Sequence, residues 1–417
     1  MVGVSPDRVM LLRADMPGGR SVGSGSLVGP SLVLTAAHVV FDDDGHPADQ
    51  LEVGGINAPQ VAARVIWPTS YAAADKSGQL DAALVQITEP SWAPPRLAPV
   101  RWGRLTGRQP GVACEATGFP RALVDPDGVR DSDQVSAQIN PGSRHVAGRY
   151  DLKVTSAVPK QLHHEPSLWA GFSGAGVFAN GLLVAVVIVD ERGGYSGDRL
   201  SAVPVYRLAS DAEFTDLVRA AGAGLSGPAQ LESVELDGIL TPPHLRAPRR
   251  GNDPSRSPAM LLRPEMGVVP FHGRTELTAA LITWCQDTEI EVGVRMLTGP
   301  GGQGKTRTAN HLAQHLLGLP PSTDDGSRWV CGFLNADADE RDLAVLADTD
   351  APLLILVDYA ETRSDQLRRL LPLLWDADTG HPVRVLLLAR ATGDWWTALA
   401  RDLDGEPGEV IALGTLD

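Results

Sequence analysis

The first half of the chain is a series of short apolar segments separated by clusters of glycine, proline, aspartate and serine. The segments include VMLL, GSLVG, SLVLTA, ALVQI, LLVAVVIV and SAVPV, all within residues 1–207. Short strands bounded by turn residues are typical of all-β barrels and sandwiches. The pattern therefore predicts an all-β domain, followed by a helix over residues 210–222. Ser210 and Glu213 have the spacing of a capping box at the start of that helix.

The pattern changes twice in the second half. Residues 224–260 are rich in proline and glycine, which predicts a linker between domains. From residue 261 onward, apolar strands such as PLLILVD and VRVLLLA alternate with amphipathic helices such as TRTANHLAQHLLGL. This alternation predicts an α/β domain with a parallel sheet covered on both faces by helices. The expected organisation is thus an all-β domain over 1–223, a linker over 224–260 and an α/β domain over 261–417.

Composition narrows the range of partners. With 43% hydrophobic and 21% charged residues, the chain has the composition of a globular protein. Its net charge of −15 argues against a general nucleic-acid binder, which would need a basic surface. No apolar segment approaches the ~20 residues that cross a bilayer, and no signal peptide is visible at the N-terminus. We therefore expect a cytoplasmic protein that binds neither nucleic acid nor membrane.

The sequence predicts no intrinsic metal site. The chain has three cysteines, widely spaced, which form neither a disulfide framework nor a CxxC metal site. His163, His164 and Glu165 resemble a ligand cluster. However, adjacent residues project in different directions, so a loop is the preferred interpretation.

Three polar residues in the first half stand beside apolar strands. His38 ends the segment SLVLTAAH, Asp81 precedes the strand ALVQI, and Ser173 lies in GFSGAGVF. Singly, each has an ordinary structural interpretation, as a hydrogen-bonded core histidine, a capping aspartate and a turn serine. Together they supply a nucleophile, a general base and a group that orients the base. The order His, Asp, Ser also differs from that of the subtilisins and the α/β-hydrolases.

The motifs TAAH, LDAALV and GFSGAGV resemble those of trypsin-like serine proteases, over roughly residues 5–220. The resemblance implies a double-barrel endopeptidase acting on a protein substrate. His38 would be the general base, Asp81 would hold its tautomer, and Ser173 would be the nucleophile. The backbone N–H groups of Gly171 and Ser173 would form the oxyanion hole.

Two positions depart from the digestive members of that family. Digestive trypsins pair a newly cleaved N-terminus with an aspartate just before the serine, and this chain has Phe172 there. Activation by that ion pair is therefore excluded. The position six before the serine sets basic specificity in trypsin, and here it is Ser167. Asp190 and Glu191 could line the specificity pocket or lie in a loop.

The second half contains GPGGQGKT, in which Gly299, Gly304, Lys305 and Thr306 match the P-loop pattern GxxxxGK[ST]. An apolar strand precedes the loop and a helix follows it, as phosphate binding by backbone amides requires. We include Gly302 in this predicted nucleotide-binding loop. Lys305 is the only lysine after Lys160 in a chain that otherwise uses arginine. This exception suggests that the site needs a compact ammonium group.

Downstream residues fit the same chemistry. Asp358 ends the strand PLLILVD, as a carboxylate that holds Mg²⁺ would. Glu361 lies three residues later and could polarise the attacking water, and Arg390 ends VRVLLLAR as a candidate γ-phosphate sensor. No lysine follows Lys305 to supply the NKxD motif that reads guanine. ATP with Mg²⁺ is thus the predicted ligand, and Thr306, Asp358 and Glu361 are the predicted residues around Mg²⁺.

Residues 261–412 resemble the STAND class of signal-transduction ATPases. The segment VVPFHGRTEL is similar to the motif that opens their nucleotide domain, which implies that Arg274 lies near the nucleotide. The resemblance implies a bacterial effector, in defence or regulated cell death, that forms a homo-oligomer on activation. In that class a winged-helix region and C-terminal repeats follow. We therefore expect the trigger to be read by a sensor that is not present in this chain.

Two other interpretations remain open. In one, the β domain is a catalytically inactive binding module on a signalling ATPase. In the other, the ATPase is a chaperone-like motor that feeds a protease, although no substrate-pore signature supports it.

Overall fold

The structure is a computed structural model that describes residues 4–56, 58–71, 80–144, 147–156, 167, 169–188, 197–243, 271–322, 327–403 and 408–413. By their contacts, the residues form two compact units. The first comprises residues 1–105 and 109–234, and the second comprises residues 106–108 and 235–417. Asp190, Glu191, His163, His164 and Glu165, singled out from the sequence, lie outside the described residues.

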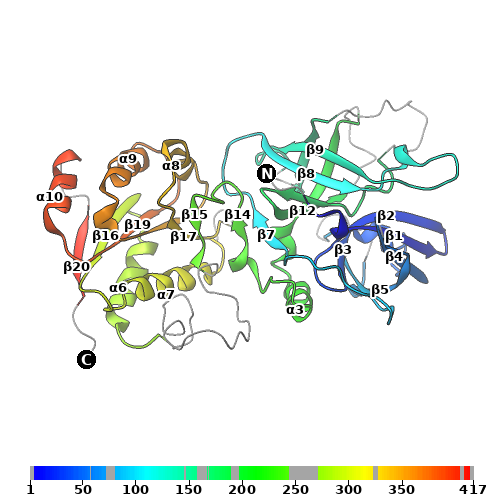
Figure 1. Cartoon of the computed structure of the whole chain (residues 1–417), viewed down its shortest axis with the longest axis horizontal. Helices are drawn as coiled ribbons and strands as arrows, with labels where there is room; N and C mark the ends of the chain where they lie inside the picture. Colours follow the sequence, from blue (N-terminus) through cyan, green and yellow to red (C-terminus); the bar gives the residue numbers. More distant parts are fainter. Residues whose placement is uncertain are drawn as a thin grey trace. The chain divides into compact units, whose positions relative to one another are not determined.

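The first unit begins with a closed barrel of six strands, drawn in blue in Figure 1. Its strand order is β1-β2-β3-β6-β5-β4. The strands are β1 (Val9–Met16), β2 (Gly19–Leu27), β3 (Leu32–Thr35), β4 (Gln50–Gly55), β5 (Val61–Trp67) and β6 (Ala83–Ile87). The apolar residues of β3 and β6 are buried in one core. A short helix, α1 (Ala37–Val40), follows β3.

A second six-stranded ring follows, because β11 pairs with both β8 and β12 and closes the order β11-β8-β9-β10-β13-β12. Its strands are β8 (Val112–Gly118), β9 (Asp133–Ile139), β10 (Tyr150–Val154), β11 (Gly176–Ala179), β12 (Leu182–Ile188) and β13 (Arg199–Pro204). In β9 the buried residues Val135, Ala137 and Ile139 alternate with outward-facing ones, as a strand lining a core requires. The predicted all-β, double-barrel fold is confirmed.

Short elements complete this unit. They are β7 (Arg101–Arg104), β14 (Glu232–Ser233), α2 (Val205–Leu208), α3 (Ala212–Ala220) and the 3-10 turns Pro6–Arg8, Arg121–Leu123 and Pro228–Gln230. The predicted cap of α3 is wrong by one residue. Asp211 accepts the Phe214 N–H at 2.9 Å, whereas the Ser210 hydroxyl donates to the Tyr206 carbonyl. The aspartate caps the helix because its carboxylate also favours the positive helix N-terminus.

The second unit contains a sheet of order β15-β17-β18-β19-β16-β20, in which all pairs are parallel except β15–β17. Its strands are β15 (Leu240–Thr241), β16 (Val292–Thr298), β17 (Val330–Leu334), β18 (Leu353–Asp358), β19 (Val383–Ala389) and β20 (Glu409–Ala412). Its helices are α6 (Thr275–Gln286), α7 (Lys305–Leu317), α8 (Glu340–Ala347), α9 (Ser364–Trp375) and α10 (Gly393–Asp402), with a 3-10 turn at Ala360–Thr362.

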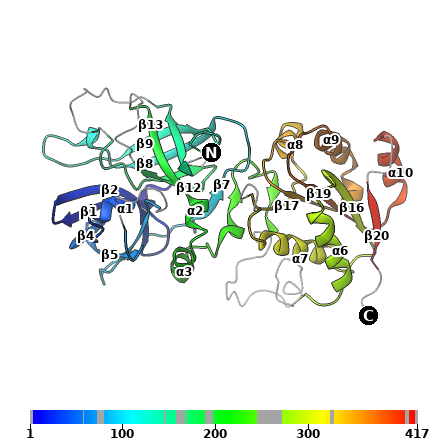
Figure 2. The same cartoon turned by 180° about the vertical axis from the view of Figure 1, so that it is seen from behind.

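Helices cover both faces of this sheet. Helices α6 and α7 lie on one face, and α8 and α9 on the other, as both views show (Figures 1 and 2). Along β18, Leu353 and Ile355 join the core under α8 and α9, whereas Leu354 and Leu356 join the core under α6 and α7. Because successive side chains of the strand point to opposite faces of the sheet, they contribute to two separate apolar cores. The predicted parallel sheet with two covered faces is confirmed.

Part of the segment predicted as a linker is packed. Residues 224–243 include β14 and β15, and Leu225, Leu231, Val234 and Leu240 are all buried. The two units meet in the sequence between Val234 and Glu235, inside the range assigned to a linker. A high content of proline and glycine predicts turns. It does not show whether the apolar residues between those turns are buried in a core.

In the described part of the chain, no helix has the length and apolar character needed to cross a membrane.

Candidate functional sites

The first candidate site is built on two neighbouring strands of the first barrel. β3 and β6 are antiparallel, with Thr35 opposite Ala83. His38 follows β3 in α1, and Asp81 precedes β6, so the pairing brings these two residues together. The His38 Nδ1 atom lies 2.8 Å from Asp81 Oδ2 and 3.0 Å from Oδ1, and the His38 backbone N–H donates to Oδ1 at 3.1 Å. The carboxylate therefore fixes both the ring and the backbone of His38.

The environment of Asp81 keeps it ionised. Only 17% of its side chain is exposed, and this burial by itself raises the pKa. The hydrogen bonds and charge of His38 lower the pKa more strongly in sum, so the pKa of Asp81 lies below its ordinary value. Tyr71 also hydrogen-bonds to Asp81 through its side chain. Burial, reinforced by the Asp81 charge, raises the pKa of Tyr71, which keeps its hydroxyl as a donor.

No motif in the sequence singles out Tyr71. It lies ten residues before Asp81 in a segment without a recognisable pattern, YAAADKSGQL. Its ring packs against Phe41, with 5.5 Å between ring centroids. A single tyrosine outside a motif can be recognised as a hydrogen-bond partner of Asp81 only from the structure.

Ser173 lies in a tight turn before β11 that is pressed against β2. Its carbonyl accepts the Ser24 N–H at 2.7 Å, and the Thr35 hydroxyl donates to the Ser24 carbonyl at 2.6 Å. The next residue, Gly174, has φ +91°, and a Cβ there would lie 2.0 Å from the Ser24 carbonyl oxygen. Only glycine permits this approach. The turn that carries Ser173 is therefore held against β2 and the end of β3, the strand that leads to His38.

Phe172 is fully buried in the core of the second barrel. Its ring meets that of Trp169 edge-on, with 5.4 Å between centroids. Trp169 in turn donates from its ring nitrogen to the Gly197 carbonyl at 2.8 Å, and its backbone N–H donates to the Ser167 hydroxyl at 3.3 Å. The position occupied by an ion-paired aspartate in digestive trypsins is thus an apolar anchor here.

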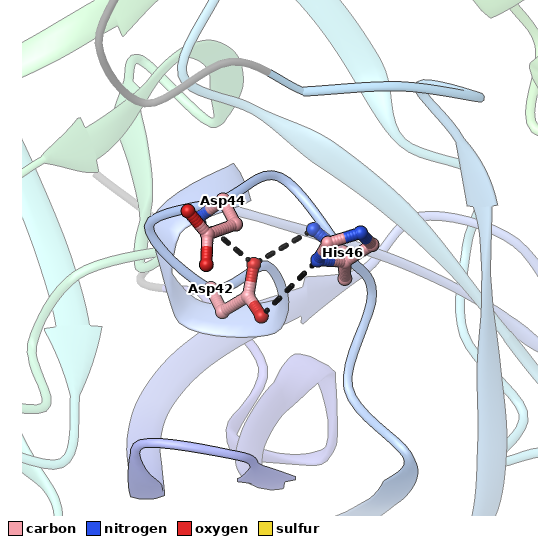
Figure 3. Close-up of side chains that lie close together, drawn as sticks. All are labelled: Asp42, Asp44 and His46. Atoms are coloured by element: carbon pink, nitrogen blue, oxygen red, sulfur yellow. Dashed lines mark hydrogen bonds and ion pairs between the residues drawn. The ribbon is translucent and has the colours of Figure 1, made fainter.

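One cluster of the first barrel has the residue types of a metal site. Asp42, Asp44 and His46 lie together in a turn after α1 (Figure 3), with possible ligand atoms within 4.8 Å of one another. Asp42 Oδ1 already accepts the backbone N–H groups of Asp44 at 3.1 Å and His46 at 2.7 Å. These bonds are those of an aspartate-capped turn. They account for the grouping without an ion.

The second candidate site lies at the carboxyl ends of the parallel strands, where ligands bind in open α/β sheets. The glycine-rich loop 299–304 joins β16 to α7, and Gly302 (φ +83°) and Gly304 (φ +81°) adopt left-handed conformations. The Lys305 ammonium donates to the carbonyls of Gly299 and Pro300. Burial lowers the pKa of Lys305, against the charges of Glu361 and Asp358.

The loop forms one wall of a cleft of about 1140 Å³. Thr306 and Asp358 meet in it, with the Thr306 hydroxyl 3.2 Å from Asp358 Oδ2. Glu361 and Arg390 also line the cleft, and Glu361 Oε2 is buried with no hydrogen-bond partner among the described residues. A buried, unpartnered carboxylate oxygen next to a cleft is a position where a bound group is expected.

The cleft is basic although the chain is acidic. Five basic residues line it against three acidic ones: Lys305, Arg307, Arg363, Arg369 and Arg390 against Asp358, Glu361 and Asp365. Arg307, Arg363 and Arg369 were not singled out from the sequence. Their positions in the sequence could have indicated them as cleft residues. Arg307 directly follows Thr306, and Arg363 and Arg369 lie in the segment ETRSDQLRR shortly after Asp358.

Two predicted nucleotide residues stand behind the cleft rather than in its lining. Gly299 and Arg274 are not among the lining residues. Arg274 has φ +57° and donates to the Gln303 carbonyl of the glycine-rich loop at 2.8 Å. It therefore supports the loop from outside.

Comparison with known proteins finds a family match within the first half of the chain. A family model described as a trypsin-like peptidase domain matches residues 23–186. No curated protein matches the chain.

Among solved structures, an M. tuberculosis protease in its active form is 16% identical, over 53% of this chain and 82% of its own, with a TM-score of 0.33. An inactivated protease paralogue of the scabies mite is 14% identical, over 51% and 95%, with a TM-score of 0.37. Mouse neuropsin is 15% identical, over 53% and 97%, with a TM-score of 0.37. Likenesses this distant carry no argument about activity. The family match places a trypsin-like serine peptidase domain in the N-terminal half of the chain.

The contact at Gly174 leads to a first prediction. In Gly174→Ala, the methyl group would overlap the Ser24 carbonyl and the Thr35 hydroxyl, whose oxygen lies 2.2 Å from the Cβ position. We expect the free energy of unfolding to fall by at least about 3 kcal/mol, measured by denaturant titration, because strain of about 1–2 kcal/mol adds to the overlap.

The matched control is Gly128→Ala, where φ is +80° but no atom lies within 4 Å of the added Cβ. It should lose only the conformational part, about 1 kcal/mol. Equal losses in the two variants would contradict the close approach of the serine turn to β2.

Proposed function

We propose that this protein is a serine endopeptidase whose activity is controlled by an ATP-binding domain of the STAND type. The observation that carries the peptidase is the His38–Asp81 pair, 2.8 Å apart, within a trypsin-like domain whose Ser173 turn is held against β2 and the end of β3. The family match supports the trypsin-like domain. The catalytic roles of His38, Asp81 and Ser173 are the proposal.

The geometry of the pair supports a specific division of roles. Because Nδ1 of His38 faces the carboxylate, the ring proton belongs on Nδ1, which leaves the Nε2 lone pair to accept a proton. In the proposed reaction, Ser173 Oγ bonds to the substrate carbonyl carbon as its proton passes to Nε2. The C–N bond then breaks as that proton passes to the leaving amine. A water molecule, activated by the same His38, hydrolyses the acyl-enzyme.

Ionised Asp81 would stabilise the imidazolium that forms in each step. The exposure of the His38 side chain, 38%, is compatible with its reaching a substrate held at the surface. The backbone N–H groups of Gly171 and Ser173 are proposed to bind the oxyanion.

We propose further that the cleft of the α/β unit binds ATP with Mg²⁺. Gly299, Gly302 and Gly304 shape the loop, whose amides and the N-terminus of α7 would face the phosphates. Lys305 would bind them as a point charge, and Arg390 would contact the terminal one. The Thr306 hydroxyl and Asp358 carboxylate are the hard oxygen ligands that Mg²⁺ prefers, and they already meet at 3.2 Å. Bound Mg²⁺ would neutralise the phosphate charge, and Glu361 would orient the attacking water.

The combination supports a signalling effector rather than a housekeeping protease. By this proposal, the protein acts in the bacterial cytoplasm, in defence or regulated cell death. In this proposal, nucleotide-bound homo-oligomers form in response to a trigger and switch on cleavage of a protein substrate.

Fluorophosphonate labelling tests the nucleophile. We expect the wild type to be labelled, Ser173→Ala to lose labelling, and Asp81→Asn to react ~10⁴-fold more slowly because the wrong histidine tautomer is favoured. The readout is the labelling rate followed by gel fluorescence. Ser210→Ala, which removes an exposed serine beside α3, is the matched control and should react like the wild type. A wild type that never labels would support the alternative of an inactive binding module.

Titration with a fluorescent ATP analogue and Mg²⁺ tests the second site. Lys305→Ala should bind at least about tenfold more weakly, a loss of about 1.4 kcal/mol, because it removes the ammonium group that faces the phosphates. Lys153→Ala, an exposed lysine on β10, is the matched control. Equal binding by the two variants, or displacement by GTP as readily as by ATP, would contradict the assignment.

The two experiments combined test the switch. If nucleotide gates the peptidase, ATP with Mg²⁺ should change the labelling rate of the wild type by about 5–150-fold, the usual range of coupling between sites. Lys305→Ala should show no such change. Equal labelling rates with and without nucleotide would contradict the proposed control by nucleotide. They would not contradict the proposed peptidase site or the proposed nucleotide site.

A further inference from the structure

One arginine of the first unit contacts the peptide that precedes the serine turn. The carbonyl of Ala170 accepts two hydrogen bonds, from Arg130 Nη1 at 2.8 Å and from the Arg121 backbone N–H at 2.8 Å. Arg130 Nη1 also donates to the Phe119 carbonyl at 3.0 Å. Arg130 thus links the segment before β9 to the segment before Ser173.

The orientation of one peptide plane follows from these bonds. The only cis peptide bond among the described residues is Trp67–Pro68, so the Ala170–Gly171 peptide is trans. In a trans peptide the C=O and N–H bonds point in opposite directions. Since the Ala170 C=O points at Arg130 and Arg121, the Gly171 N–H points away from both.

The other side of Gly171 is fixed as well. Its carbonyl accepts the Ser24 hydroxyl at 2.7 Å, and its φ of +95° is a glycine conformation. A Cβ at Gly171 would lie 2.0 Å from Arg130 Nη1 and 2.6 Å from the Phe119 carbonyl oxygen. The guanidinium group therefore packs directly on the glycine. Within the described residues, the Gly171 N–H has no acceptor.

We propose that Arg130 is a positioning residue for the oxyanion hole. It holds the Ala170 carbonyl so that the opposed Gly171 N–H stays directed at the reaction centre. The inference rests on the proposed peptidase function, because it gives that N–H its role. Arg130 touches neither substrate nor the reacting atoms.

The alternative state is a flipped peptide. Without Arg130, the Ala170 carbonyl would keep one donor, the Arg121 N–H, and could rotate toward the position of the oxyanion. A carbonyl oxygen at that position repels the developing negative charge, where an N–H would stabilise it. The half-buried guanidinium of Arg130 suits this task because it presents several donors in a fixed plane and can bond two carbonyls at once.

The test is the rate constant of fluorophosphonate labelling, separated from its amplitude. The phosphonyl oxygen occupies the oxyanion position as the Ser173 Oγ–P bond forms and fluoride leaves. We expect Arg130→Ala to lower the rate constant ~10²-fold, as loss of an oxyanion donor does. Arg130→Lys should recover part of that loss, and added guanidinium ion should partly rescue Arg130→Ala but not Ser173→Ala.

A merely structural role gives a different result. It would lower the melting temperature and the labelled fraction while leaving the rate constant of the folded fraction unchanged, and that outcome would overturn the proposal. If Arg130→Ala does not fold, Arg130→Met, which removes the donors to Ala170 but keeps a long side chain, is compared with the wild type by the same rate constant. The control is Arg219→Ala, which removes an exposed arginine from α3.

The outcomes distinguish a failure of the positioning role of Arg130 from a failure of the proposed peptidase function. A wild type that labels at the same rate as a folded Arg130→Ala or Arg130→Met overturns the positioning role alone. A wild type that never labels overturns the proposed peptidase, and the role of Arg130 with it.

Discussion

The first unit depends on one buried serine of β2, Ser24, whose polar groups are all engaged. Its N–H donates to the Ser173 carbonyl and its hydroxyl to the Gly171 carbonyl, both at 2.7 Å. The same hydroxyl accepts the Phe119 N–H at 2.9 Å, and its carbonyl accepts the Thr35 hydroxyl. Because Ser24 is fully buried, each unmade bond would cost about 1–3 kcal/mol, so the arrangement is strongly specified. One side chain of the first barrel thereby locates the serine turn of the second.

The turn itself is stabilised by an apolar anchor and a cation rather than by an ion pair. Phe172 fills the core on one side, and Arg130 holds the Ala170 carbonyl on the other. A buried ring needs no partner released by proteolysis, since the free energy of its burial is available as soon as the chain folds. The serine turn therefore needs no cleavage event to become ordered. The proposed control by nucleotide therefore has to act on something other than this anchor.

The sequence predicted the strands that consist of long apolar runs. It also predicted the three candidate catalytic residues, because their order along the chain matches that of a known triad. β12 and β18 are such runs, and His38, Asp81 and Ser173 were visible because three weak signals agreed. Ser24, Tyr71 and Arg130 were invisible for a physical reason. Each is a single polar residue outside any recognisable motif, and Ser24 has its partner Gly171 147 residues along the chain. The short helix α8 was not singled out either, although Asp339 and Asp342 form a capping box at its start.

The bias of the chain toward arginine has a structural explanation in these contacts. Arg384, fully buried within β19, donates to the carbonyls of Trp284, Asp287 and Glu291 around the end of α6. Arg363 donates to the carbonyls of Leu334 and Asn335, each at 2.8 Å. In both cases one planar group donates to several carbonyls at once, which an ammonium cannot do with fixed geometry. Arginine therefore serves the fold in these contacts, and Lys305, at the start of α7 directly after the glycine-rich loop, is the exception that the proposed nucleotide site would explain.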